Sequence, residues 1–182
     1  MLPECFYNLS DSTRRYKNIA FLLACWRNTC NSIRQTKDMK PLHALTAGLA
    51  GAVALTVTHQ LLHKIFNSAP RMDLMGEEAL TKISGKAAET PESTLYNITM
   101  AGDVAVNSLY YALAAIGDSK NAPLRGVALG LGAGIGGVYL PKYLGLTNAY
   151  SDRTLTTRLM TIGIYTLGGL ITGVVMSKLD ND

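Results

Sequence analysis

The sequence predicts an all-α fold: an integral membrane bundle of four transmembrane helices plus one amphipathic surface helix. The first reason is the stretch between Arg158 and Lys178, which holds nineteen residues without a charge. As a helix it would rise about 28 Å, close to the thickness of a bilayer's hydrocarbon core. The second reason is that charged residues make up only 16% of the chain, against about 25% in a typical soluble domain. A helix that is apolar on nearly every face has no side for water, so lipid is its simplest surrounding.

Three earlier stretches share this length and this apolar character. We therefore place the transmembrane helices at residues 42–63, 95–117, 126–146 and 157–177. Lys40 and Lys64 bracket the first of them, as charges at the two membrane surfaces would.

Glycine recurs along the last two spans at helical spacing. Gly126, Gly130 and Gly134 are four residues apart, and Gly169 and Gly173 repeat the same interval. Small residues at this spacing form one face of a helix, on which a neighbouring backbone can lie close. These five glycines are therefore predicted helix-packing positions.

A shorter helix is predicted between the first two spans, over residues 71–86. The run from Asn67 to Pro70 ends the preceding helix. Beyond it, apolar residues recur at intervals of three and four, while charged residues occupy the other faces. The segment is too short and too charged to span a bilayer, so we expect it to lie on the membrane surface.

Residues 1–38 read as a basic N-terminal tail, and residues 39–182 as the membrane domain. Three interpretations of the tail stay open. It is a cytoplasmic tail that is disordered or carries a short surface helix; or it is an export signal; or it is a reading frame extended upstream of a natural start at Met39. Leu-Leu-Ala-Cys25 resembles a lipoprotein signal, and Arg14-Arg15 resembles a twin-arginine signal.

One stretch resembles a known group of proteins: Ala69–Gly76 (APRMDLMG), which follows the first span. Over about residues 40–80 the chain is similar to uncharacterised small bacterial multi-pass inner-membrane proteins. The resemblance implies a bacterial inner membrane and no activity, because such proteins have no known function to carry over. Four spans put both termini on one side, where ten of the seventeen Lys and Arg residues then lie. This excess predicts that the termini are cytoplasmic.

Asp103 is the residue within the predicted spans that most strongly suggests function. A carboxylate inside a membrane helix costs roughly 2.5–3.5 kcal/mol on insertion scales, so it is expected to face the bundle interior and to have a partner. Asn107 lies one turn away. Asp103 and Asn107 are therefore the candidate ion or substrate site. Two alternatives stay open: Asp103 lies near enough to the membrane interface to be solvated, or it is protonated and forms a structural hydrogen bond between helices.

His59 and His63 are four residues apart at the end of the first span. Two imidazoles at this spacing lie on one face of a helix and can chelate a transition metal. However, the HExxH and Glu-x-x-His patterns are missing. Paired histidines at a helix end are more often interfacial polar residues, so metal binding is the minor interpretation.

No catalytic residues, no cofactor and no nucleic-acid partner are predicted, and we expect the protein not to be an enzyme. Residues 132–137 satisfy GxGxxG, but without the preceding strand that a dinucleotide-binding site needs. Lys and Arg gather before Met39 and at the ends of the spans, not on a stripe interleaved with aromatic residues.

Two functions remain. The first is a structural or partner-binding membrane subunit, whose partners are the lipid bilayer and a second copy of the chain or another membrane protein. The alternative is a small-solute or ion permease with Asp103 as its coupling residue, which a faint internal repeat at an offset of 82 residues supports. A metal-dependent membrane enzyme that uses His59 and His63 comes third.

Overall fold

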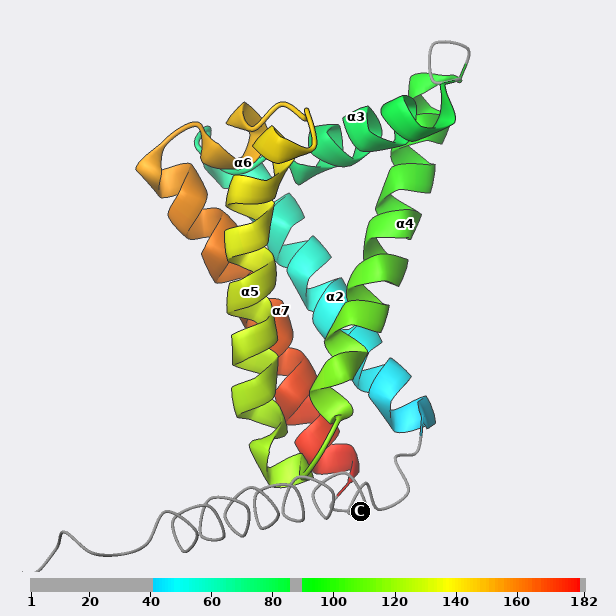
Figure 1. Ribbon diagram of the computed structural model, residues 1–182, viewed down its shortest axis with the longest axis vertical. Helices are drawn as coiled ribbons and strands as arrows, with labels where there is room; N and C mark the ends of the chain where they lie inside the picture. The colour runs from blue at the N-terminus through cyan, green and yellow to red at the C-terminus, as the bar shows by residue number, and fades with distance from the viewer. Residues whose placement is uncertain (1–40, 86–89, 181–182) are drawn as a thin grey trace, which may run out of the picture. The chain divides into compact units, whose positions relative to one another are not determined.

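The computed structural model describes residues 41–85 and 90–180, and every regular element in these residues is helical (Figure 1). The long helices are α2 (Pro41–Ile65), α4 (Glu92–Ala112), α5 (Ala122–Tyr143) and α7 (Leu155–Leu179). The shorter ones are α3 (Met72–Ser84), η2 (Leu113–Ala115), η3 (Ser119–Asn121) and α6 (Ala149–Asp152). The predicted all-α class is confirmed. The predictions for the tail at residues 1–38 lie outside the described residues.

Three helices are long and apolar enough to cross a membrane. They are α2, α7 and the stretch Ser119–Tyr143, which contains α5. This finding agrees with the prediction of a membrane protein. α4, which covers the second predicted span, is not among the three, because Asn97, Asp103 and Asn107 lower its mean hydropathy.

The helices at the second predicted span, 95–117, begin and end a few residues earlier in the sequence than that range. α4 begins at Glu92, and at Leu113 the α-helix gives way to the 3-10 helix η2. The predicted end, Gly117, has a positive φ of 105° and lies in the turn beyond both helices. Glycine adopts this backbone conformation without the steric penalty that a side chain would bring.

The third predicted span, 126–146, is displaced in the same direction. α5 begins at Ala122, with Pro123 in its first turn, and ends at Tyr143 rather than at residue 146. Proline suits the first turn because the amide hydrogen that it lacks would have no partner there. Gly145 follows the helix with a φ of 69° and turns the chain.

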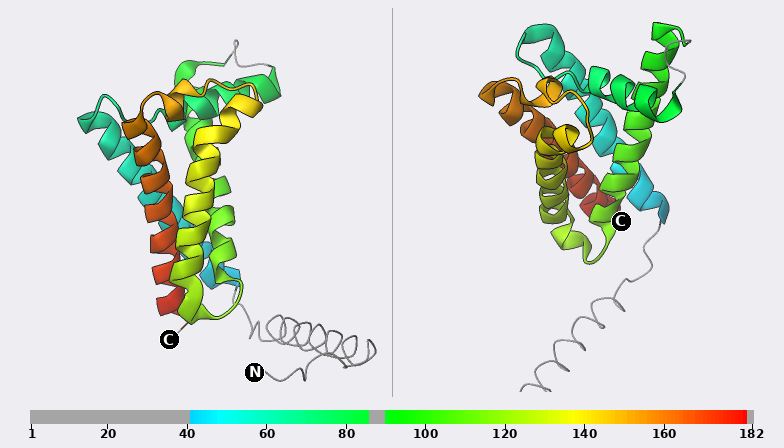
Figure 2. Two further views of the ribbon diagram at one scale, coloured as in Figure 1. Left: turned by 60° about the vertical axis from the view of Figure 1, so that its left-hand side comes forward. Right: turned by 45° about the horizontal axis from the view of Figure 1, so that its top comes forward.

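α7 is the central helix of the described bundle. It packs along α5 on one side and along α2 on another, and α4 packs against α2 (Figures 1 and 2). α4 and α5 have few contacts with each other.

The distribution of side chains is the reverse of that in a soluble protein. Large apolar residues of α2, among them Leu49, Val53 and Leu61, point outward and are about half exposed. The interior is rich in small and hydroxyl-bearing residues, such as the fully buried Thr161 and Thr172, and also holds a few large apolar ones, among them Leu55, Tyr111 and Ile164. Both threonine hydroxyls donate to carbonyl oxygens one turn earlier in α7. Small residues inside and large apolar residues outside are typical of helices packed within lipid.

The five predicted packing glycines lie in one seam between α5 and α7. All of them are buried. A Cβ added to Gly130 would lie 2.5 Å from the carbonyl oxygen of Tyr165, and one on Gly134 would lie 2.7 Å from Cα of Ile162. A Cβ on Gly126 would likewise overlap the carbonyl oxygen of Gly169. The two backbones therefore touch where no larger residue fits.

α3 lies across one end of the long helices (Figure 1). It occupies the predicted range 71–86 and ends at Gly85, which caps it in the left-handed conformation with a φ of 65°. Along its length, the Glu78 carboxylate accepts a hydrogen bond from the Thr147 amide at 2.9 Å, and Lys82 donates to the carbonyl of Gly145. These contacts hold α3 on the loop that follows α5.

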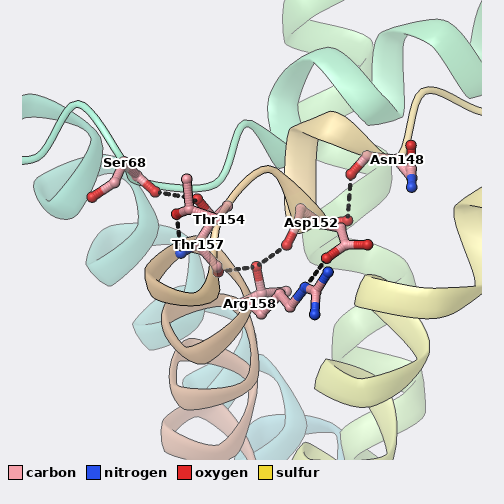
Figure 3. A network of polar contacts seen from close by, with 8 residues as sticks. Ser68, Asn148, Asp152, Thr154, Thr157 and Arg158 are labelled. Atoms are coloured by element: carbon pink, nitrogen blue, oxygen red, sulfur yellow. Dashed lines mark hydrogen bonds and ion pairs between the residues drawn. The ribbon is translucent and has the colours of Figure 1, made fainter.

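The loop before α3 is fixed by a polar network at the start of α7 (Figure 3). The Thr157 hydroxyl donates to the carbonyl of Ser68 at 2.8 Å and lies 2.9 Å from the hydroxyl of Thr154, the N-cap residue of α7. Next to it, Arg158 pairs with Asp152. The network fixes the loop between α2 and α3 against the start of α7, and so sets where α3 begins.

Candidate functional site

A cavity of about 440 Å³ lies where α2, α3, α4 and α7 meet. Helices α3 and α4 supply most of its walls, and α2 and α7 supply the rest. The volume is within the range of about 300–1,000 Å³ that is usual for small-molecule sites. Sequence patterns do not reveal this cavity, because its four walls come from segments far apart in the chain.

The walls of the cavity are mainly apolar. Leu55, Leu80 and Ile164 are among the residues that line it. Ile83 and Val106 also line it, yet they are 85% and 67% exposed, so they stand at its rim. The cavity therefore opens between α3 and α4 onto an apolar surface.

Asp103 places its carboxyl group in this cavity. Its Oδ1 accepts a hydrogen bond of 2.9 Å from Nδ2 of Asn107, one turn along α4. Asn107 is only 8% exposed and lies outside the cavity lining. In the described part of the chain no Lys or Arg forms an ion pair with Asp103. Asn107 thus holds one oxygen of the Asp103 carboxyl group, and no hydrogen bond to the other oxygen is seen in the described residues.

His59 reaches the same cavity from α2. Its Nε2 lies 2.9 Å from the carbonyl oxygen of Pro70, and the residue is 5% exposed. A carbonyl oxygen only accepts, so Nε2 carries the proton. Nδ1 is then an acceptor in the neutral ring and a donor in the charged ring. The structure therefore brings together His59 and Asp103, which the sequence assigns to two separate hypotheses.

Thr99 adds an unsatisfied hydroxyl group to the site. The residue lines the cavity and is 8% exposed, and its Oγ1 has no hydrogen-bond partner within residues 41–85 and 90–180. Buried hydroxyl groups are nearly always hydrogen-bonded in native proteins.

The predicted histidine pair does not form one site. His63 is exposed, while the ring of His59 is buried against Pro70. Within the described ranges no three His, Cys, Asp or Glu residues lie close enough to hold a metal ion. The geometry therefore gives the metal hypothesis no support.

A second, polar cleft of about 450 Å³ lies between α3 and the start of α4. Asp73, Glu77 and Glu92 line it together with Arg71. Nε and Nη2 of Arg71 donate to the Asp73 carboxylate, with the Nη2–Oδ2 distance at 3.0 Å. Asp73 lines both the cleft and the apolar cavity. It therefore stands in the wall that separates the two.

The charges of the cleft change the pKa values of its carboxyl groups. Partial burial alone would raise the pKa of Asp73, but the hydrogen bonds and charge of Arg71 outweigh it and lower that pKa. The pKa of Glu77 is raised, first by partial burial and then by the charges of Asp73 and Glu92. One Arg therefore does not neutralise the cleft.

Comparison with protein-family models, with curated proteins and with solved structures gives no match to this chain. The class of the protein follows from the structure itself. It is an all-helical chain in which three helices are long and apolar enough to cross a membrane, as expected of a membrane protein.

Proposed function

We propose that the protein is a small-solute permease of four spans, and that its solute binds in the cavity beneath α3 next to Asp103. The observation that carries this proposal is the cavity itself, which is apolar in its walls and contains the carboxyl group of Asp103. A carboxyl group placed in a membrane helix is expensive, and such residues usually mark solute or ion pathways.

The proposal takes α4 as the fourth span. Its 21 residues rise about 31 Å, enough for a hydrocarbon core. Asn107 and Ser108 of this helix are buried, while Val106 and Leu109 are exposed as lipid contacts would be. α3 then lies on the membrane surface at the end of the bundle. We further propose a bacterial inner membrane as the location, with both termini in the cytoplasm.

The competing hypothesis, a structural or partner-binding subunit, assigns no role to the cavity. It predicts that a substitution which fills the cavity without disturbing the fold leaves the function unchanged, whereas the permease proposal predicts a loss of transport. Two glycines allow a matched test of this difference. Gly102 lines the cavity, Gly163 does not, and a Cβ added to either meets no atom within 4 Å.

The test is uptake into vesicles of phosphatidylethanolamine and phosphatidylglycerol that contain the purified full chain. Three aromatic probes of similar size are offered: benzyltrimethylammonium, phenylmethanesulfonate and phenylacetamide. We expect at least one to enter faster than it enters protein-free vesicles. Gly102→Phe should reduce that uptake at least about tenfold, because the ring occupies the solute's place.

Gly163→Phe is the control and should transport at the wild-type rate. Circular dichroism and size-exclusion chromatography should show that both variants fold. Uptake of none of the three probes, or wild-type uptake by folded Gly102→Phe, would overturn the permease proposal.

A further inference from the structure

We propose that the solute is an amphiphilic organic cation, and that it reaches the cavity by way of the polar cleft between α3 and the start of α4. This inference rests on the proposed function, since it names the class of solute that the same cavity takes. Three features of the two spaces carry it: their charge, their walls and the residue that they share.

The charge of the cleft favours a cation. Three carboxyl groups, those of Asp73, Glu77 and Glu92, line it against the single guanidinium of Arg71. A cleft lined by one sign of charge raises the local concentration of the opposite ion and speeds its association. An anion would be repelled at the same place.

The charge of the cavity also favours a cation. Asp103 lines it without an ion pair to Lys or Arg in the described residues, and His59 is the only residue of the lining that can carry a positive charge. Because Nε2 of His59 already donates to Pro70, Nδ1 is an acceptor in the neutral ring. A carboxylate held by Asn107 is the natural counter-ion for an ammonium group.

The walls distinguish an organic cation from a metal ion. An inorganic cation needs several oxygen or nitrogen ligands at short distance. Residues 41–85 and 90–180 contain no such group of three acidic, His or Cys side chains. Most of the lining is aliphatic, and two rim residues, Ile83 and Val106, are exposed toward the surface where lipid is expected. A solute with a charged head and an apolar body fits this cavity, because the head can lie next to Asp103 and the body against the aliphatic lining.

Asp73 joins the two spaces. It lines the cleft and the cavity, and its partner Arg71 lines the cleft alone. A cation that leaves the cleft for the cavity therefore passes the Asp73 carboxylate, where it replaces Arg71 as the partner of that carboxylate. The final position of its charge is next to Asp103.

The first measurement is equilibrium binding of the three probes to the purified full chain in detergent, by calorimetry. We expect benzyltrimethylammonium to bind more tightly than phenylacetamide, and phenylmethanesulfonate to bind least. Asp103→Asn should weaken binding of the ammonium probe at least about tenfold and leave the amide unchanged, because only the charge of the site has been removed. The side-chain oxygen of this variant can still accept from Asn107, and Asp180→Asn, at the other end of the bundle, is the matched control.

The second measurement tests the route. Uptake of benzyltrimethylammonium at low salt should fall about tenfold in the double variant Glu77→Gln, Glu92→Gln, and the difference should shrink at high salt. Asp180→Asn is again the control, because Asp180 lines neither space. It should behave as the wild type.

The outcomes separate this inference from the permease proposal. Preferential binding or uptake of the sulfonate or the amide overturns the cation inference and leaves the permease standing. Unchanged ammonium binding in Asp103→Asn overturns it as well. Unchanged uptake in the double variant overturns the route through the cleft. Failure of all three probes, or wild-type uptake by folded Gly102→Phe, overturns both proposals.

Discussion

At the scale of single residues, the chain combines two carboxyl groups whose surroundings differ. Asp103 is held by an amide and forms no ion pair with Lys or Arg among the described residues, whereas Asp73 is held by a guanidinium. The ion pair of Asp73 is 38% exposed on the Arg71 side and 11% on the Asp73 side, so it is only partly screened by solvent. An unpaired carboxylate in an apolar wall is costly to keep charged, so it attracts a counter-ion. Of the two carboxyl groups, Asp103 is therefore the one without an ion pair to Lys or Arg.

The raised pKa of Glu77 predicts how cation uptake depends on pH. Burial and the charges of Asp73 and Glu92 raise that pKa, and the charge of Arg71 opposes them less strongly. Glu77 therefore ionises only as the pH rises through a window above the usual Glu range, and a cation in the cleft favours the ionised form. By linkage, uptake of benzyltrimethylammonium should increase as the pH rises through this window.

Glu77→Gln should remove this part of the pH dependence. The comparison is the initial uptake rate of the two proteins, measured from about pH 4 to pH 8 in equal salt. An unchanged slope in the variant would mean that another group sets the pH dependence.

At the scale of helices, glycine decides which surfaces meet. In the α5–α7 seam the obstacle to a larger residue is backbone, as at Gly130, where a Cβ would lie 2.6 Å from Cα of Thr166. Backbone atoms cannot turn aside as a flexible side chain can. The helices must separate to admit even one methyl group, and the close contacts along the seam are then lost.

Gly130→Ala should therefore lower the free energy of unfolding by about 1–3 kcal/mol, the usual cost of overpacking a core. Gly163→Ala is the matched control on α7, because its Cβ meets nothing within 4 Å. It should leave stability unchanged or raise it by up to about 1 kcal/mol, since alanine favours helix more than glycine does. Thermal unfolding in one detergent compares them. Equal midpoints for the two variants would show that the seam does not limit stability.

At the scale of the whole molecule, the apolar exterior and the small-residue interior agree with a lipid surrounding. The proposed topology depends on whether α4 crosses the membrane with the other three long helices. If it does, Thr90 before the helix and Ser119 after it lie on opposite sides. If α4 lies along the surface, both residues lie on one side.

A cysteine scan decides between these two topologies. In a background with Cys5, Cys25 and Cys30 changed to Ser, a single cysteine replaces either Thr90 or Ser119. A membrane-impermeant maleimide applied to intact spheroplasts should label only one of the two variants. Lysis should make both reactive. Labelling of both variants before lysis would contradict the four-span topology.

The sequence by itself determined the features that belong to one segment at a time. Length and apolar character located the helices to within a few residues, and regular spacing identified Gly126, Gly130 and Gly134 as one face. The interval of four residues also placed Asn107 where it can hold Asp103, because residues one helical turn apart are neighbours. These properties are local, so they do not depend on how the helices pack.

Only the tertiary structure decided which faces meet. It brought His59 and Asp103, which are far apart in the sequence, to one cavity with Asp73 and Thr99, and it separated His59 from His63. Helical spacing puts His59 and His63 on one face, but the loop that carries Pro70 folds back on His59 alone. The physical reason is that a helix presents several faces. The contacts along its whole length select the buried one, and they involve segments far away in the chain.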